Sequence, residues 1–317
     1  MKERKTVETD QNNDEIKSAG TPITKGKKGA FSNVITGFMV LVMLAGIGLL
    51  LYPTISEKWN ALHQSRIIAG YTEQIQSDDS DHVEKEWDDA VRYNKELLSK
   101  NDRYKMSEKE EEEYTGLLNS TGTGIMGFIT IPKIEVRLPI YHSTDESVLQ
   151  IGVGHIPGSS LPVGGESSHT VLSGHRGLPS AKLFTRLDEM TEGDIFALHV
   201  LGKVLIYKVC DVTVVLPDEV DNIDIEKGKD YCTLVTCTPY GVNTHRMLVK
   251  GEHTETITEE EYVARNYEAT GGTSLNAVES DASQGHEIPE YLPIAFAVFA
   301  VIVLAFALFA PVKKKKR

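Results

Sequence analysis

The sequence predicts a mainly β domain, either a sandwich or a barrel, placed between two membrane-spanning helices. From Ile125 onward, short runs rich in Val, Ile, Thr and Tyr alternate with turn residues, as in GFITIPKI, HTVLSGH and DYCTLVTCTP. Two long uncharged stretches flank these runs, one before them and one near the C-terminal end. Several short strands at this spacing are typical of sandwiches and barrels.

The two uncharged stretches run from Gly29 to Ser56 and from Tyr291 to Val312. Each holds the roughly 20 apolar residues that cross a bilayer, so we expect transmembrane helices at 31–52 and 291–312. Lysines precede the first stretch and KKKKR follows the second, which predicts cytoplasmic termini and an extracytoplasmic segment 57–290 in the cell membrane. A cleaved signal peptide is the alternative for the first stretch, but no clear small-x-small site follows it.

Between the spans, the composition separates a helical stem from the β domain. Residues 55–100 are rich in Glu, Lys, Ala and Leu and read as helical, with a break at Ser77 to Asp81. Gly202–Lys203 is typical of a hairpin turn, and Thr258 with Glu261 forms a capping box that begins a helix. The expected segments are a cytoplasmic tail (1–30), a stem with a loop (53–124), the β domain (125–256), a helix and linker (257–290) and a basic tail (313–317).

Charge and cysteine content restrict the function. The formal net charge of −13 argues against nucleic acid as a partner, because phosphate binding needs a basic face. No CxxC or His/Cys cluster has metal spacing, so we expect no metal and no organic cofactor. The three cysteines are Cys210, Cys232 and Cys237, and an odd number leaves at least one thiol free. Cys210 and Cys232 lie within predicted strands and read as packing residues, although a disulfide between them stays open.

Cys237 is the candidate nucleophile. Alternation along a strand places Thr233, Val235 and Cys237 on one face, and Thr-Pro-Tyr-Gly follows at once and ends the strand. A hairpin return through HRMLVKG brings Arg246 back beside Cys237, and a guanidinium near a thiol favours its thiolate form. The alternative is an inert cysteine that only fills space.

A cysteine nucleophile usually works with an imidazole. Among ten histidines, His175 is well placed, because it ends a β-type run and is followed by Arg176-Gly177, a turn. Composition and spacing alone do not choose between it and its extracytoplasmic competitors, which are His142, His155, His169 and His245.

Three blocks of the sequence resemble a known family. TLVTCTPYGVNTHRMLVKG (Thr233 to Gly251) closely resembles the TLxTCTPYGxNTxRLLVxG signature of sortases, specifically the class C enzymes that polymerise pilins. Gly127 to Gly165 is similar to the first half of the class C barrel, and HTVLSGHRGLPSAKLFTRLDEMTEGD (His169 to Asp194) to its histidine-bearing segment. The resemblance covers roughly residues 125–255, and a second span after the barrel is also common in class C members.

The resemblance implies an eight-stranded sortase-type β-barrel with short helices. Carried over residue by residue, Cys237 takes the nucleophile position, His175 the catalytic histidine position and Arg246 the arginine position. Class C enzymes commonly carry a lid with an Asp-Pro-aromatic motif, where this chain has Asp102-Arg103-Tyr104. The expectation is that Asp102 pairs with Arg246 and that Tyr104 lies over Cys237. Without proline the loop is less stiff, and an ordinary exposed loop is the alternative.

The implied activity is transpeptidation on a substrate with a C-terminal LPxTG-like sorting motif. Cys237 would form a thioester, His175 would move the protons, and a pilin lysine amine would accept the acyl group. The partners are therefore pilin or surface-protein substrates and the lipid bilayer. Three rivals stay open: a sortase that uses a cell-wall precursor amine, a hydrolytic cysteine peptidase, and a noncatalytic two-span surface protein that binds a partner.

Overall fold

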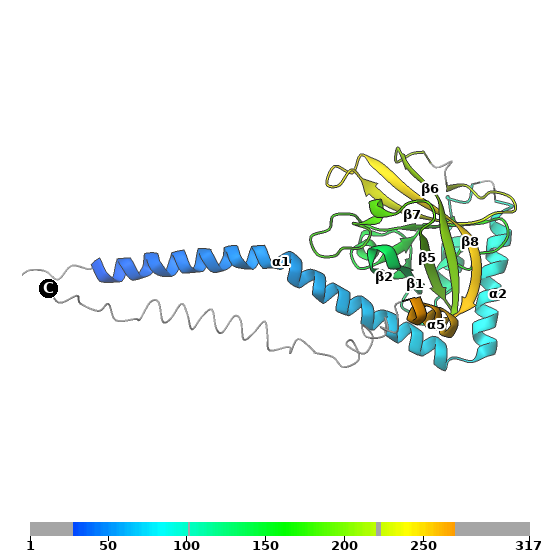
Figure 1. The fold of residues 1–317 in the computed structure, drawn as a ribbon, viewed down its shortest axis with the longest axis horizontal. Helices are drawn as coiled ribbons and strands as arrows, with labels where there is room; N and C mark the ends of the chain where they lie inside the picture. The colour runs from blue at the N-terminus through cyan, green and yellow to red at the C-terminus, as the bar shows by residue number, and fades with distance from the viewer. Residues whose placement is uncertain (1–27, 101, 220–222, 270–317) are drawn as a thin grey trace, which may run out of the picture. The chain divides into compact units, whose positions relative to one another are not determined.

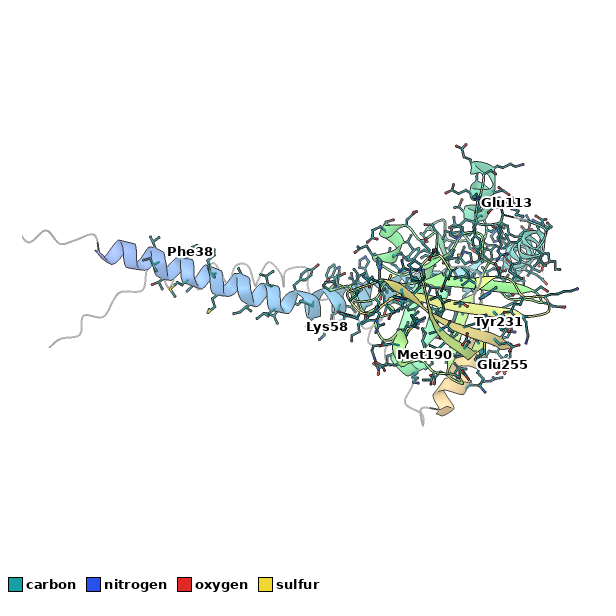
Figure 2. The ribbon with its side chains drawn as sticks, turned by 90° about the horizontal axis from the view of Figure 1, so that it is seen from above. Phe38, Lys58, Glu113, Met190, Tyr231 and Glu255 are labelled. Carbon is teal, nitrogen blue, oxygen red and sulfur yellow. The ribbon has the colours of Figure 1, made fainter. Side chains whose placement is uncertain are left out.

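The computed structural model describes residues 28–100, 102–219 and 223–269. The second predicted span, the linker before it, the basic tail and the residues before Lys28 lie outside the described residues. Helix α1 (Lys28–Ser77) is long and apolar enough to cross a membrane, and within the described part of the chain it alone meets that description. Its apolar side chains are exposed, as Phe38 is in Figure 2. An exposed apolar helix of this length indicates a membrane anchor.

Two further helices follow α1 and pack beside the β domain. Helix α2 (Ser80–Leu97) begins after Asp79, whose side chain accepts a hydrogen bond from the Asp81 N–H. The side chain of Asn94 donates to the Leu161 carbonyl at 3.1 Å and accepts from the Leu161 N–H at 2.7 Å. These two hydrogen bonds to the backbone hold α2 against the loop that precedes β4. Helix α3 (Glu108–Gly116) lies in the segment expected to be a loop, and a Ser107–Glu110 capping box begins it.

The β domain is a closed barrel of eight strands in the order β1-β2-β3-β4-β7-β8-β6-β5. This confirms the expected eight-stranded barrel. Figure 1 shows several of these strands, with β7, β6 and β8 labelled near one another. The pairs β2–β3 and β4–β7 are parallel, and the other neighbours are antiparallel. The strands are β1 (Ile125–Ile131), β2 (Val136–His142), β3 (Val153–His155), β4 (Ser168–Ser173), β5 (Ile195–Val200), β6 (Lys203–Val215), β7 (Asp230–Thr238) and β8 (His245–Thr258).

Short helices connect and close the barrel. They are η1 (Pro132–Ile134), α4 (Glu146–Leu149), η2 (Leu187–Glu189) and α5 (Glu259–Ala269). The capping-box helix is present as α5, where the Thr258 hydroxyl accepts from the Glu261 N–H at 3.2 Å. The β5–β6 turn consists of Leu201 and Gly202, both with positive φ, and not of the predicted Gly202–Lys203. Lys203 already pairs with Val200, so the turn lies one residue earlier.

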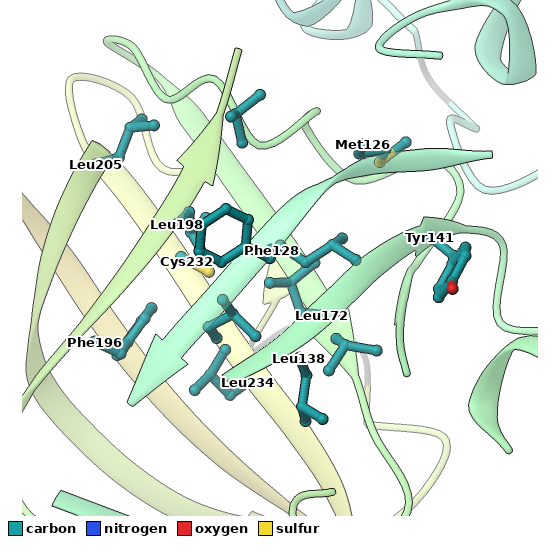
Figure 3. Close-up of a cluster of buried hydrophobic side chains, with 14 of the residues drawn as sticks. Met126, Phe128, Leu138, Tyr141, Leu172, Phe196, Leu198, Leu205, Cys232 and Leu234 are labelled. Atoms are coloured by element: carbon teal, nitrogen blue, oxygen red, sulfur yellow. The ribbon is translucent and has the colours of Figure 1, made fainter. Parts of the chain in front are cut away.

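The barrel interior is filled by apolar side chains from every strand. Figure 3 shows Phe128, Leu198, Leu234 and Cys232 converging inside the sheet, and all four are buried. Burial of such side chains is the main stabilising contribution to a closed barrel.

A second apolar cluster lies on the outer face of β4, β7 and β8. Val171, Val235 and Leu248 form it, one from each strand, and Ile223 from the loop before β7 packs against them. Val235 belongs to this cluster whereas Leu234 belongs to the interior, as alternation along a strand requires. Cys237, two residues after Val235, therefore emerges on the outer face.

Candidate active site

Strand β7 is the centre of the candidate site, because it lies between β4 and β8 in the barrel. Cys237 is half-buried and one residue from the end of β7. Its partner across the antiparallel pair with β8 is Arg246. Residues directly opposite each other in an antiparallel pair point to the same face of the sheet. Arg246 therefore flanks Cys237 on one side of the outer face.

His175 reaches the other side of Cys237 through the parallel pairing of β4 with β7. The register runs to Ser173 opposite Val235 and continues past the end of β4. The Gly174 N–H donates to the Val235 carbonyl at 3.0 Å, and the Arg176 Nη1 donates to Thr238 Oγ1 at 3.2 Å. The first contact is made by the residue before His175 and the second by the residue after it. Their partners on β7, Val235 and Thr238, lie on either side of Cys237 along that strand.

The guanidinium of Arg246 is held against the loop that joins β7 to β8. Its Nη1 donates to the carbonyl oxygens of Asn243 at 3.2 Å and His245 at 3.1 Å. The remaining donors of a guanidinium are directed away from these carbonyls in a fixed fork, so they are available to a substrate carbonyl or an oxyanion.

The imidazole of His175 lies beside the carboxylate of Glu146. Its Nε2 is buried and makes no hydrogen bond within the described part of the chain, while Glu146 Oε1 lies 3.5 Å away at ion-pair distance. The pKa of Glu146 lies below its usual range, first because Gln150 donates to the carboxylate and second because His175 is near. Sequence analysis did not single out Glu146, because it lies 29 residues before His175 and no local pattern links the two positions.

The loop after Cys237 packs against the loop after His175. Gly177 has φ +80°, and a Cβ built there would lie 2.9 Å from the Tyr240 ring. Only glycine combines this backbone conformation with such a close approach. Arg176 adds an ion pair with Asp188 at 2.6 Å. The close approach of Gly177 to Tyr240 holds the loop after His175 next to the loop after Cys237.

The four histidines that compete with His175 in the sequence have structural partners. His169 is buried on β4, where its Nδ1 donates to the Asp224 carbonyl at 2.7 Å and its Nε2 accepts from Thr233 Oγ1 at 2.7 Å. Burial lowers the pKa of His169 to about 4 and that of His155 to about 4. His142 is buried between two carbonyls, and His245 lies beside the Thr244 hydroxyl at 2.9 Å.

The segment expected to form a lid lies against the loop before β7. Asp102 pairs with Lys105 at 2.7 Å and not with Arg246. Arg103, in the place of the family's proline, reaches Asp224 Oδ1 at 2.7 Å with its side chain only 17% exposed. The Tyr104 hydroxyl lies 3.5 Å from the Ile223 carbonyl. Arg103 therefore makes a side-chain contact that a proline at this position could not make.

The other two cysteines differ from each other. Both are free, so the disulfide left open by the sequence does not form. Cys232 is buried in the barrel core, as expected. Cys210 is exposed, so its expected packing role is wrong. A register shift between Val209 and Asp211 turns it outward, beside a cavity of about 490 Å³ whose lining does not include Cys237.

The fold and site define a class of protein: a cysteine acyl-transfer enzyme on a closed mixed β-barrel, with an N-terminal membrane anchor. The Sortase domain family matches residues 129–254. The chain is similar to Sortase D of Bacillus subtilis (strain 168), with 32% identity over 148 residues, 43% of this chain and 72% of the relative. The chain belongs to the sortase family of cysteine transpeptidases.

Solved structures of sortase C extend this similarity. Sortase C1 from Streptococcus agalactiae is 45% identical with a TM-score of 0.58, covering 60% of this chain and 98% of that one. Sortase C of Clostridium perfringens with the C-terminal cell wall sorting motif is 42% identical with a TM-score of 0.53, covering 60% and 98%. Both comparisons extend well beyond the signature around Cys237.

Proposed function

We propose that Cys237, His175 and Arg246 are the catalytic residues and that the protein joins pilins through their sorting motifs. The observation that carries the proposal is the placement of Cys237 on β7, with Arg246 on the neighbouring β8 and His175 just after the end of the neighbouring β4. Nucleophile, proton carrier and oxyanion donor must meet at one carbonyl carbon. Residues at neighbouring positions on adjacent strands lie close enough together to act on one carbonyl group.

The first step is acylation. The Cys237 thiolate attacks the threonine carbonyl of an LPxTG-like motif, and Arg246 donates to the oxyanion that forms. The threonine–glycine C–N bond then breaks, and the departing nitrogen takes a proton from His175. The thioester remains on Cys237. The similarity to a sortase C crystallised with a sorting motif supports this substrate class.

The second step transfers the acyl group to a lysine amine of the next pilin. His175 accepts the amine proton while the new isopeptide bond forms and the Cys237 thiolate leaves. The pilin acceptor is supported by the class C resemblance of the motif blocks and by similarity to structures named sortase C. Two membrane spans, one of them at 291–312, would keep the extracytoplasmic site close to membrane-tethered substrates.

We also propose that residues 102–106 act as a lid. The segment is joined to the loop before β7, whose Ile223 packs on the outer apolar cluster beside Cys237. A sorting motif that binds along this face would have to displace both segments. In this chain Arg103, rather than a proline or an Asp102–Arg246 pair, holds the lid in place.

The acceptor is tested by offering two amines to the full-length protein in detergent. One is a peptide with an internal lysine, and the other is a peptide with a free N-terminal glycine amine of cell-wall cross-bridge type. Together with an LPxTG protein, the proposal predicts an isopeptide at the lysine Nζ, identified by tandem mass spectrometry. Transfer to the glycine amine alone would instead favour cell-wall anchoring. Hydrolysis alone would favour a peptidase, and full function of Cys237→Ala would favour a binding protein.

A further inference from the structure

We propose that Glu146 is a positioning residue for His175, and that its carboxylate orients the imidazole and stabilises its protonated form during acylation. The inference rests on the proposed function, because it assigns Glu146 a role in the Cys237–His175 reaction. Glu146 Oε1 lies 3.5 Å from the buried His175 Nε2, which has no hydrogen-bond partner in the described part of the chain. A buried polar nitrogen in this state requires a partner.

The carboxylate of Glu146 is itself held in place. Gln150 Nε2 donates to the same oxygen, Oε1, at 2.6 Å. The helix α4 that begins at Glu146 is fixed to α1, because Gln64 Nε2 donates to the Ile151 carbonyl at 2.9 Å. It is also packed on β3, since a Cβ at Gly154 would lie 3.2 Å from Leu149 Cδ2. A small shift of the carboxylate is enough to turn the ion-pair contact into a hydrogen bond.

The charges around His175 leave this role to Glu146. Across β7, Arg246 is directed at carbonyl oxygens of the β7–β8 loop, and Cys237 is the reacting group. On the histidine's own segment, Arg176 is paired with Asp188 and donates to Thr238. Glu146 is the carboxylate at ion-pair distance from His175 in residues 28–100, 102–219 and 223–269.

The expected effect is moderate, because the Glu146 side chain is 71% exposed and solvent screens its charge. Acylation needs the thiolate of Cys237 together with the imidazolium of His175, which delivers a proton to the leaving nitrogen. A neighbouring carboxylate favours the imidazolium and thus increases the population of this pair. Exposed pairs of this kind change an equilibrium by about two- to five-fold.

The test is the pH dependence of Cys237 alkylation by iodoacetamide in the full-length protein, from about pH 5 to about pH 9, a range that includes the ordinary histidine and cysteine pKa values. Peptide mapping by mass spectrometry separates Cys237 from exposed Cys210, which serves as an internal reference. The variants are Glu146→Gln, Glu146→Asp and His175→Gln. Asp145→Asn is the matched control, since Asp145 is exposed and accepts from the Ser143 hydroxyl.

We expect Glu146→Gln to slow Cys237 alkylation below neutral pH by about two- to five-fold, with Cys210 unchanged. Glu146→Asp should restore part of the rate, and Asp145→Asn should match the wild type. In acylation by an LPxTG peptide, the alkaline limb of the pH–rate profile should move to lower pH in Glu146→Gln, a change that a purely structural role does not produce.

Three outcomes would overturn the inference, and they separate it from the proposed function. A wild-type profile in Glu146→Gln with an altered profile in His175→Gln would remove only the role of Glu146. A wild-type profile in both variants would remove the Cys237–His175 pair as well. If Glu146→Gln changed only the transfer to an amine acceptor, the carboxylate would act on the acceptor and not on His175.

Discussion

Arg103 Nη2 lies 2.7 Å from Asp224 Oδ1 and joins the segment before α3 to the loop before β7. The guanidinium also donates to the Tyr104 hydroxyl at 3.2 Å and lies 4.8 Å from the centre of the Tyr104 ring. On the other side of the loop, His169 donates to the Asp224 carbonyl at 2.7 Å. The backbone of Arg103 runs directly over Gly158, where a Cβ would lie 2.4 Å from the Arg103 carbonyl oxygen. Asp224 is thus held by the lid segment and by the barrel at once.

Replacing Arg103 by Ala should open the lid. The substitution removes the ion pair with Asp224 and the hydrogen bond to Tyr104, so the closed state loses stability relative to the open one. We expect acylation of Cys237 by an LPxTG peptide to become about two- to five-fold faster, as loss of a partly exposed ion pair allows. Intact mass spectrometry of the full-length protein gives the rate.

Lys105→Ala is the control for the lid variant, because it removes the exposed ion pair with Asp102 and leaves Asp224 untouched. It should acylate at the wild-type rate. Equal rates in Arg103→Ala and the wild type would mean that the Arg103–Asp224 contact does not limit access to Cys237.

Substitution of Arg246 should lower kcat much more than it affects folding. If its guanidinium donates to the oxyanion, Arg246→Ala should reduce kcat by about 10²- to 10³-fold. Arg246→Lys keeps the charge but loses the planar fork, so it should recover only a small part of the rate. The control is Arg186→Lys, because Arg186 precedes η2 and makes an exposed ion pair with Glu189. A near-normal kcat in Arg246→Lys would show that charge alone is sufficient.

Gly177→Ala should destabilise the two loops of the site. The substitution forces an alanine to φ +80° and places its Cβ 2.9 Å from the Tyr240 ring. The left-handed conformation alone costs about 1–2 kcal/mol, so the Tm of the protein in detergent should fall by about 2–8 °C. Gly116→Ala is the matched control, because it lies in α3 with no atom within 4 Å of the added Cβ. An unchanged Tm in Gly177→Ala would contradict the packing of the two loops.

Stability should fall on mild acidification because His169 is buried as the neutral base. Burial lowers the pKa of His169 to about 4 in the folded protein, whereas the unfolded chain has the ordinary value of about 6.5. The unfolded state binds more protons between these values, so the stability contributed above about pH 6.5 is lost as the pH falls towards about 4. Thermal melting between these pH values should show a smaller loss of Tm in His169→Gln than in the wild type. His63→Gln, at an exposed site on α1, should keep the wild-type slope, and a wild-type slope in His169→Gln would contradict the neutral buried histidine.

The sequence predicted local features well and pairings between distant strands poorly. Alternation in TLVTC placed Val235 and Cys237 on one face, and the structure puts Val235 in the outer cluster and Cys232 in the core. The parallel pairing of β4 with β7, which brings the segment of His175 beside Cys237, leaves no trace in periodicity. The choice of His175 among the histidines came from the resemblance alone.

Other differences have local physical causes. Helix α3 begins with the Ser107–Glu110 capping box, a local signal that lies within a strongly charged segment with few apolar residues. The β-bulge that turns Cys210 outward depends on the β6–β8 register, which one strand cannot reveal. Asp102 does not pair with Arg246 as expected, because the ammonium of Lys105, three residues later, pairs with its carboxylate.

The assignment of the catalytic residues is tested most directly by whether Cys237 forms a thioester with a sorting motif. Full-length protein in detergent is incubated with an LPxTG peptide and measured by intact mass spectrometry, alongside Cys237→Ala, His175→Ala and Cys210→Ala. We expect an acyl adduct in the wild type and in Cys210→Ala, no adduct in Cys237→Ala, and a strongly reduced yield in His175→Ala. An adduct that persists in Cys237→Ala, or full acylation without His175, would contradict the assignment of the catalytic residues.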